Sequence, residues 1–171
     1  PEADFSLRAF RDDILPRLGD PELALVDVRS PAEFNGEIIA PPGMSESAQR
    51  AGHIPGAVHV DWRTDLIDPA GADALLLAGP EAITALTTRL GIGDGTEVVI
   101  YDDSQGLFAA RVWWTLRAYG LQAVRVLDGG FPAWVEDGHA ISSSASTPLP
   151  ATFRPGDPAR MRVTTTDVRA M

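Results

Sequence analysis

The sequence predicts an α/β domain built around a mainly parallel sheet. Two observations support this fold class. Short apolar runs typical of buried strands alternate with segments of helical periodicity, and Gly, Pro and Asp separate the two kinds of segment. The chain has 171 residues, of which 44% are hydrophobic, so it is long enough for one well-cored domain and short for two. We therefore expect helices on both faces of a single sheet.

The first half of the chain predicts two helices and two strands. Apolar residues at near-helical spacing predict a helix over residues 5–18, which Pro16 should bend or end. The apolar run LALVDV predicts a buried strand at 23–28. Residues 30–34, SPAEF, offer an N-cap serine, a following proline and a glutamate three residues after the cap, which is typical of a helix start. Residues 52–60 predict a turn that leads into a strand.

The second half continues the alternation. Residues 80–90 predict a helix, because Pro80 and Glu81 are typical of a helix start and Gly91 is typical of a helix end. Residues 97–101, EVVIY, give the strongest strand signal. A helix at 107–120 and a strand at 123–127 follow, and the sequence FPAWVEDG at 131–138 predicts a short last helix.

Composition excludes several classes of function. The net charge of −10 argues against a nucleic-acid partner, because phosphate binding requires basic surfaces. All fourteen basic residues are arginine, which excludes Schiff-base chemistry on lysine. The chain has no cysteine, so disulfides, thiolate metal sites and cysteine-based catalysis are excluded as well.

Metal, cofactor and membrane binding also lack a sequence signal. The spacing of His53, His59 and His139 does not suggest a zinc site, and we expect neither a metal nor a cofactor. No apolar run approaches the ~18 residues of a membrane span, and no signal-peptide pattern opens the sequence. A cytoplasmic location is the default expectation.

Polar residues follow three of the predicted strands at their carboxyl ends. Asp27 and Arg29 follow the first strand, residues 102–106 follow the central one and residues 128–130 follow the last. These loops should converge, because ligands of parallel sheets bind beyond the carboxyl ends of the strands. The loop at 102–106 stands where many α/β enzymes hold a reactive group against a helix N-terminus, but it opens with two aspartates.

Four stretches between Leu25 and Trp134 form a specific combination: LVDVRSPAEFNGE, AGHIPGAVHV, VVIYDDSQGLFAARVWWTLRAYG and VRVLDGGFPAW. Together they resemble the rhodanese (thiosulfate sulfurtransferase) family. The resemblance implies a rhodanese-like domain over residues 1–140, with a five-stranded, mainly parallel sheet and helices on both faces. It also implies transfer of sulfane sulfur through a persulfide on a loop cysteine.

The active loop of that family has a cysteine at the end of a central strand, then five residues, then a helix. Placing Gly106 and Ala109 on the glycine and the small closing residue of the loop puts Asp103 at the cysteine position. The degenerate loop then consists of Asp103, Ser104, Gln105, Gly106, Leu107 and Phe108. Aspartate cannot carry sulfane sulfur, so we expect no catalytic residue here and a chain that is inactive by itself.

Other residues have supporting roles in this interpretation. Asp27 and Arg29 are expected to form a structural pair, and His53 is expected to hydrogen-bond loop backbone. If the helix after the loop still presents a cup of N–H donors, Asp103 should occupy or guard that cup in place of an anion. A small anion is therefore a candidate ligand.

Tandem rhodaneses often pair a cysteine-free repeat with an active one. Residues 101–114 and 127–134 are most similar to a cysteine-free first repeat, whereas residues 29–41 and 52–57 are most similar to a catalytic second repeat. The resemblance implies a structural, docking or regulatory role. The expected partner is an active rhodanese repeat in the same polypeptide or in a second copy.

The end of the chain supports a tandem arrangement. Residues 141–162 are predicted to be a Pro- and Ser-rich linker or tail, and the part at 142–158 is expected to wrap around a neighbour rather than to pack as core. Residues 163–171 predict the start of a following repeat.

Two other enzyme classes remain as alternatives. A Mg²⁺-dependent phosphatase could use Asp102 or Asp103 as nucleophile, although DDSQG lacks the Asp-x-Asp-x-Thr pattern of those enzymes. Hydrolysis through Ser104 would require a Gly-x-Ser-x-Gly elbow, and Asp102 stands where its first glycine belongs. The physiological sulfur donor and acceptor stay open.

Overall fold

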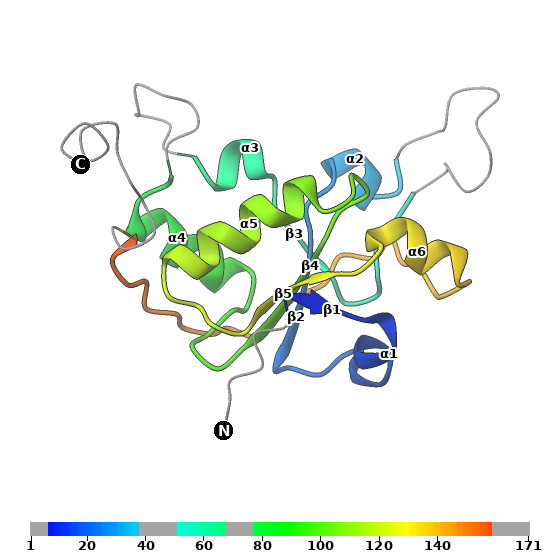
Figure 1. Cartoon of the computed structure of the whole chain (residues 1–171), viewed down its shortest axis with the longest axis horizontal. Helices are drawn as coiled ribbons and strands as arrows, with labels where there is room; N and C mark the ends of the chain where they lie inside the picture. Colours follow the sequence, from blue (N-terminus) through cyan, green and yellow to red (C-terminus); the bar gives the residue numbers. More distant parts are fainter. Residues whose placement is uncertain (1–6, 38–50, 68–76, 159–171) are drawn as a thin grey trace.

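A computed structural model describes residues 7–37, 51–67 and 77–158. Five strands of this part of the chain form one sheet in the order β1-β5-β4-β2-β3, and every pairing is parallel (Figure 1). The strands are β1 (Arg8–Ala9), β2 (Leu23–Asp27), β3 (Val58–His59), β4 (Glu97–Tyr101) and β5 (Val124–Leu127). The predicted α/β class with a five-stranded parallel sheet is thus confirmed.

The sequence of β4 explains its central position. β4 pairs with β2 on one side and with β5 on the other, and its residues 98–101 are buried. A central parallel strand is covered on both faces, so its sequence is a continuous run of apolar residues and does not alternate between apolar and polar ones.

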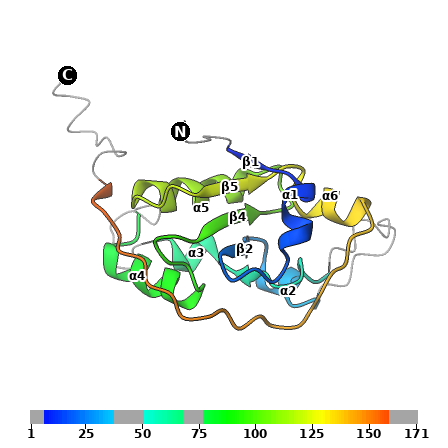
Figure 2. The same cartoon turned by 90° about the horizontal axis from the view of Figure 1, so that it is seen from below.

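Helices cover both faces of the sheet (Figures 1 and 2). The helices are α1 (Arg11–Ile14), α2 (Pro31–Phe34), α3 (Trp62–Asp65), α4 (Pro80–Arg89), α5 (Leu107–Ala118) and α6 (Gly130–Glu136). Side chains of α4 and α5 join one apolar cluster with the sheet, and those of α1, α2 and α6 join a second cluster on the opposite face. No helix in the described ranges is long and apolar enough to cross a membrane.

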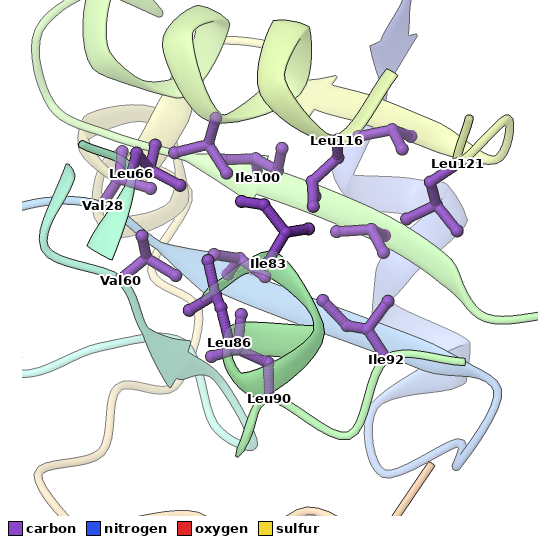
Figure 3. Packing of buried hydrophobic residues seen from close by; sticks show 14 of the residues in the cluster. Val28, Val60, Leu66, Ile83, Leu86, Leu90, Ile92, Ile100, Leu116 and Leu121 are labelled. Carbon is purple, nitrogen blue, oxygen red and sulfur yellow. The ribbon is translucent and has the colours of Figure 1, made fainter. Parts of the chain in front are cut away.

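The larger cluster lies between the sheet and helices α4 and α5. Ile83 of α4, Ile100 of β4 and Leu116 of α5 are almost completely buried and lie together there (Figure 3). Each such side chain contributes about 1.5–3 kcal/mol by leaving water. This packing holds the start of α5 at the carboxyl edge of the sheet, where the loop 102–106 lies.

The predicted helix over 5–18 is wrong at its beginning. Arg8–Ala9 forms the edge strand β1, because its backbone pairs with β5, and Ala9 is fully buried opposite Leu127. Tertiary pairing overrides the helical spacing of the apolar residues here. A helix follows only at Arg11–Ile14, and the chain continues through a 3₁₀ turn that contains Pro16, so the expected break at this proline is confirmed.

The expectation that residues 142–158 do not pack as core is wrong at Phe153, whereas the other residues of the segment are exposed or half-buried. This segment runs from α6 past α2 to α4 along its own domain (Figure 2). Phe153 is buried in the larger cluster, and the amide of Gly156 donates to the carbonyl oxygen of Tyr119 at 2.7 Å. The predicted repeat start at 163–171 lies outside the described residues.

Candidate functional site

The loop between β4 and α5 is a tight turn at the carboxyl edge of the sheet. Gln105 and Gly106 both have left-handed backbone conformations, with φ of 58° and 84°. A left-handed backbone conformation is uncommon for residues other than glycine and asparagine. The surroundings of Gln105 must therefore hold it in this conformation. The contacts that hold it come from Asp102.

The carboxylate of Asp102 fills a cup of backbone N–H groups. Its Oδ1 accepts from the amides of Ser104 at 3.1 Å and Gly106 at 2.8 Å. Its Oδ2 accepts from the amides of Phe108 at 2.9 Å and Ala109 at 3.0 Å. Asp102 is 1% exposed, so a buried negative charge lies against the positive end of α5 and satisfies the donors that a helix start leaves without partners.

We predicted that Asp103 occupies or guards the cup, and the first of these alternatives is wrong by one residue, because Asp102 occupies it. Successive side chains of a strand point to opposite faces. Ile100 lies on the α5 face and Tyr101 on the opposite face, so the next side chain, that of Asp102, returns to the α5 face. Asp103 follows in the turn and is only half-buried.

Asp103 instead lies at the mouth of the loop. Its Oδ1 accepts from the Ser104 hydroxyl at 3.1 Å, and its carboxyl lies close enough to that of Glu33 to help lower the pKa of Glu33. Partial burial opposes ionisation of Glu33, but hydrogen bonds from the hydroxyl and the amide of Ser30 outweigh it and lower the pKa of Glu33. Two acidic side chains thus meet at the open side of the loop.

Asp27 and Arg29 form a buried ion pair beneath the loops. Nη2 of Arg29 lies 2.6 Å from Oδ2 of Asp27, and both side chains are fully buried. The guanidinium also donates to the carbonyl oxygen of Gly52 at 2.5 Å and lies 3.7 Å from the ring centroid of Phe131. Burial, and then the nearby Asp27 carboxylate, raise the pKa of Tyr101 well above its ordinary value, so this hydroxyl stays protonated. The pair joins the loops, and neither side chain is exposed to solvent.

His53 joins separate segments of backbone. It is fully buried, with Nδ1 2.8 Å from the carbonyl oxygen of Phe34 and Nε2 3.1 Å from that of Ser144. Its ring stacks on that of Phe34 with centroids 3.9 Å apart. His59 instead lies against the carbonyl oxygen of Arg29 at 2.8 Å, and His139 packs on Trp134. In the described part of the chain, no three His, Cys, Asp or Glu side chains are grouped so that they could hold a metal ion.

The loop at residues 128–130 packs directly on the central loop at residues 102–106. The amide of Phe131 donates to the carbonyl oxygen of Asp102 at 2.9 Å. Gly130 has a φ of 58°, and a Cβ at this position would lie 2.4 Å from the same oxygen. Only glycine fits this close approach, which explains the DGG sequence.

Sequence reasoning missed a cavity on the side of this loop. It has a volume of about 730 Å³ and lies between the loop, the first turns of α5, the end of β5 and the edge strand β1. Its lining comes from three segments that are far apart in the chain, residues 7–8, 103–113 and 126–132, so no local pattern could have indicated it.

These features define an α/β domain whose central loop surrounds an anionic group with N–H donors, here the protein's own carboxylate. The chain belongs to the rhodanese-like domain family, whose family model, Rhodanese-like domain, matches residues 11–137. The resemblance noted in the sequence is thus confirmed.

Relatives of the chain include sulfurtransferases. The chain is 45% identical over 106 residues to human 3-mercaptopyruvate sulfurtransferase and 38% identical over 104 residues to thiosulfate sulfurtransferase of Bos taurus. Each alignment covers 60% of this chain and 35% of the relative, so the chain spans about a third of their length. The crystal structure of SseA from Escherichia coli, a 3-mercaptopyruvate sulfotransferase, superposes with a TM-score of 0.77 at 28% identity, over 96% of this chain and 61% of SseA.

Proposed function

We propose that this domain is a non-catalytic rhodanese repeat that acts as a structural, docking or regulatory partner of an active sulfurtransferase repeat. The observation that carries the proposal is the Asp102 carboxylate, which accepts four amide hydrogen bonds inside the loop. A persulfide would need the same donors to stabilise its charge. The chain also has no cysteine to form one.

The length of the relatives leads us to propose where the active repeat is found. Because the chain spans 35% of the human and bovine enzymes, those proteins have room for a second domain of this size. An active repeat in the same polypeptide, or in a second chain, would supply the sulfur-carrying cysteine. A cytoplasmic location belongs to the same proposal.

The first experiment measures activity. The purified chain is assayed for thiocyanate formation from thiosulfate and cyanide, and for cyanide-labile sulfur after incubation with thiosulfate. We expect values equal to the buffer blank, with an active rhodanese as positive control. Thiocyanate above the blank that scales with the concentration of the pure chain would refute the non-catalytic role.

The second experiment measures docking. Sedimentation velocity is recorded for the chain alone, for a separately purified active repeat of a tandem relative and for their mixture. We expect either self-association or a complex in the mixture. A chain that stays monomeric at every concentration, alone and mixed, would contradict docking.

The phosphatase alternative has no observation in its favour. Both oxygens of Asp102 already accept hydrogen bonds from the backbone, and a nucleophile needs a free lone pair directed at the substrate. Asp103 lies beside the Glu33 carboxyl, which would repel a phosphate. A magnesium-dependent phosphatase assay on the same preparation tests this alternative directly.

A further inference from the structure

We propose that His53 acts as a proton-dependent clamp on residues 142–152, here called the strap. The strap leads from α6 past α2 toward α4 (Figure 2). His53 and Ser142 exchange two backbone hydrogen bonds, of 2.7 and 2.8 Å, and Nε2 of His53 lies 3.1 Å from the carbonyl oxygen of Ser144. One titratable residue thus supplies three contacts that fasten this end of the strap.

The other end of the strap is fastened separately. The carbonyl oxygen of Thr152 accepts from the amide of Asp94 at 3.2 Å, and Phe153 follows in the larger apolar cluster. Within the described part of the chain, residues 145–151 make no hydrogen bond to another residue, and they touch the domain only by packing. Attachment of the first half of the strap therefore depends on the contacts at His53.

The two ring nitrogens of His53 both face carbonyl oxygens. Nδ1 lies 2.8 Å from that of Phe34, and Nε2 lies 3.1 Å from that of Ser144. A neutral imidazole has one N–H donor and one lone pair, so one of these contacts would set a lone pair against an oxygen. Only the protonated ring donates to both. The ring of Phe34, stacked at 3.9 Å, also offers its π face to the charge of that form.

Burial opposes a charge on this ring, since His53 is fully buried, and the two carbonyl dipoles favour it. The strap itself contains no ionisable side chain. The nearby ion pair of Asp27 and Arg29, which donates to the carbonyl oxygen of Gly52, has no net charge. The other ionisable groups around the clamp are Glu33, whose carbonyl oxygen accepts from Gly52, Tyr101, whose hydroxyl accepts from Ile54, His59 against Phe34, and His139 with Asp137 beside Trp134.

Loss of the ring proton weakens the side of the clamp that holds the strap. The contact with Phe34 is buried, whereas the contact with Ser144 is only partly buried and Ser144 itself is exposed. A neutral ring that keeps its N–H for Phe34 directs a lone pair at the carbonyl oxygen of Ser144 and repels it. Residues 146–149 form one wall of a cavity of about 250 Å³ that Leu23 and Leu90 also line, so release of the strap widens this cavity.

The test measures ring protonation and strap attachment on the same samples of the full chain, between about pH 5 and 9. The chemical shifts of the ring nitrogens give the proton state of His53. Its signals are assigned by elimination with His59→Gln and His139→Gln, because the chain has three histidines. Hydrogen exchange of the Ser142 amide, divided by the intrinsic rate at each pH, gives strap attachment. The hydrogen-bonded amide of Gly156, beyond the strap, is the internal reference.

We expect both ring nitrogens to be protonated while the Ser142 amide is protected. Its protection should fall about tenfold as the ring loses one proton, as for the loss of one charged hydrogen bond, and that of Gly156 should not change. Three results would each overturn the proposal: a neutral ring with a fully protected strap, a ring that titrates without a change in protection, or a ring that stays protonated up to about pH 9.

Two variants separate His53 from the other histidine near the strap. His53→Gln cannot titrate, so protection of the Ser142 amide should no longer depend on pH. His139→Gln, at a ring that packs on Trp134, should keep the pH dependence of the wild type. A pH dependence that persists in His53→Gln, with circular dichroism showing it folded, would disprove the clamp. If that variant does not fold, the wild-type titration decides.

Discussion

The carboxylate of Asp102 accepts a hydrogen bond from the amide of Ala109, seven residues further along the chain, at 3.0 Å. This contact closes the loop onto the first turn of α5. Three further amides donate to the same side chain, so one aspartate determines both the shape of the loop and the charge at the helix start. The amide cup of the loop is thereby filled by a side chain of the protein itself.

Removing this carboxylate should destabilise the domain. Asp102→Ala leaves four amides without their acceptor, and we expect the free energy of unfolding to fall by about 3 kcal/mol. The matched variant Asp103→Ala should lower it by less than about 1 kcal/mol, because Asp103 is only half-buried. Urea denaturation of both variants checks this. Equal losses would show that Asp102 does not hold the loop.

The same variant should gain an anion site. In Asp102→Ala the amides of Gly106, Phe108 and Ala109 become available to a bound oxyanion. We expect sulfate to raise the melting temperature of this variant more than that of the wild type, with sodium chloride at equal ionic strength as control. An identical response of the two proteins would mean that the cup collapses once the side chain is gone.

Gly130 should tolerate no side chain. Its φ is 58°, and an added Cβ would lie 2.4 Å from the carbonyl oxygen of Asp102. We expect Gly130→Ala to lower the free energy of unfolding by about 3 kcal/mol, since it adds a backbone clash to the strain of a positive φ. Gly138→Ala is the control, because φ is 74° there but no atom lies within 4 Å of the added Cβ. It should lose only about 1 kcal/mol. Thermal denaturation that ranks the two variants in the opposite order would contradict this account of the turn.

Phe153 should behave as a core residue despite its position in a Pro- and Ser-rich segment. It is 4% exposed, so Phe153→Ala should lower the free energy of unfolding by about 3 kcal/mol. Leu149 lies in the same segment and is 71% exposed, and Leu149→Ala should change it by less than about 0.5 kcal/mol. Chemical denaturation of both variants distinguishes them. A negligible effect of Phe153→Ala would mean that the segment does not pack on the domain in solution.

Glu97 should make the free energy of unfolding depend on pH in the acidic range. Partial burial raises its pKa, but hydrogen bonds from Arg17 and Arg125 outweigh burial and hold the pKa below its ordinary value of 4.5. A group whose pKa is lowered by folding stabilises the folded state above the unfolded pKa and loses this contribution as the pH falls through the folded pKa.

Between neutral pH and about pH 3, the wild type should therefore lose about 1 kcal/mol more stability than Glu97→Gln. Glu136→Gln, at an exposed position of α6, should retain the wild-type slope. Unfolding free energies measured by urea titration across this range give both slopes. Parallel curves for wild type and Glu97→Gln would show that the Arg17 and Arg125 contacts are absent in solution.

Much of the fold is predictable from local sequence. The apolar runs at 23–28 and 97–101 form β2 and β4, because a strand covered on both faces must be apolar throughout. The helix signals at 80–90 and 107–120 correspond to α4 and α5, because caps and spacing act within a few residues. The absence of cysteine alone excludes a persulfide on this chain.

Tertiary structure decided the remaining features. Residues 8 and 9 form a strand because their backbone pairs with that of β5. Phe153 is a core residue because it packs in a cluster of side chains from segments that are distant in the sequence. The sequence shows two adjacent aspartates, but which of them enters the amide cup depends on the face to which β4 directs each side chain. That direction is set by the pairing of β4 with its neighbours, and pairing between distant segments leaves no local mark in the sequence.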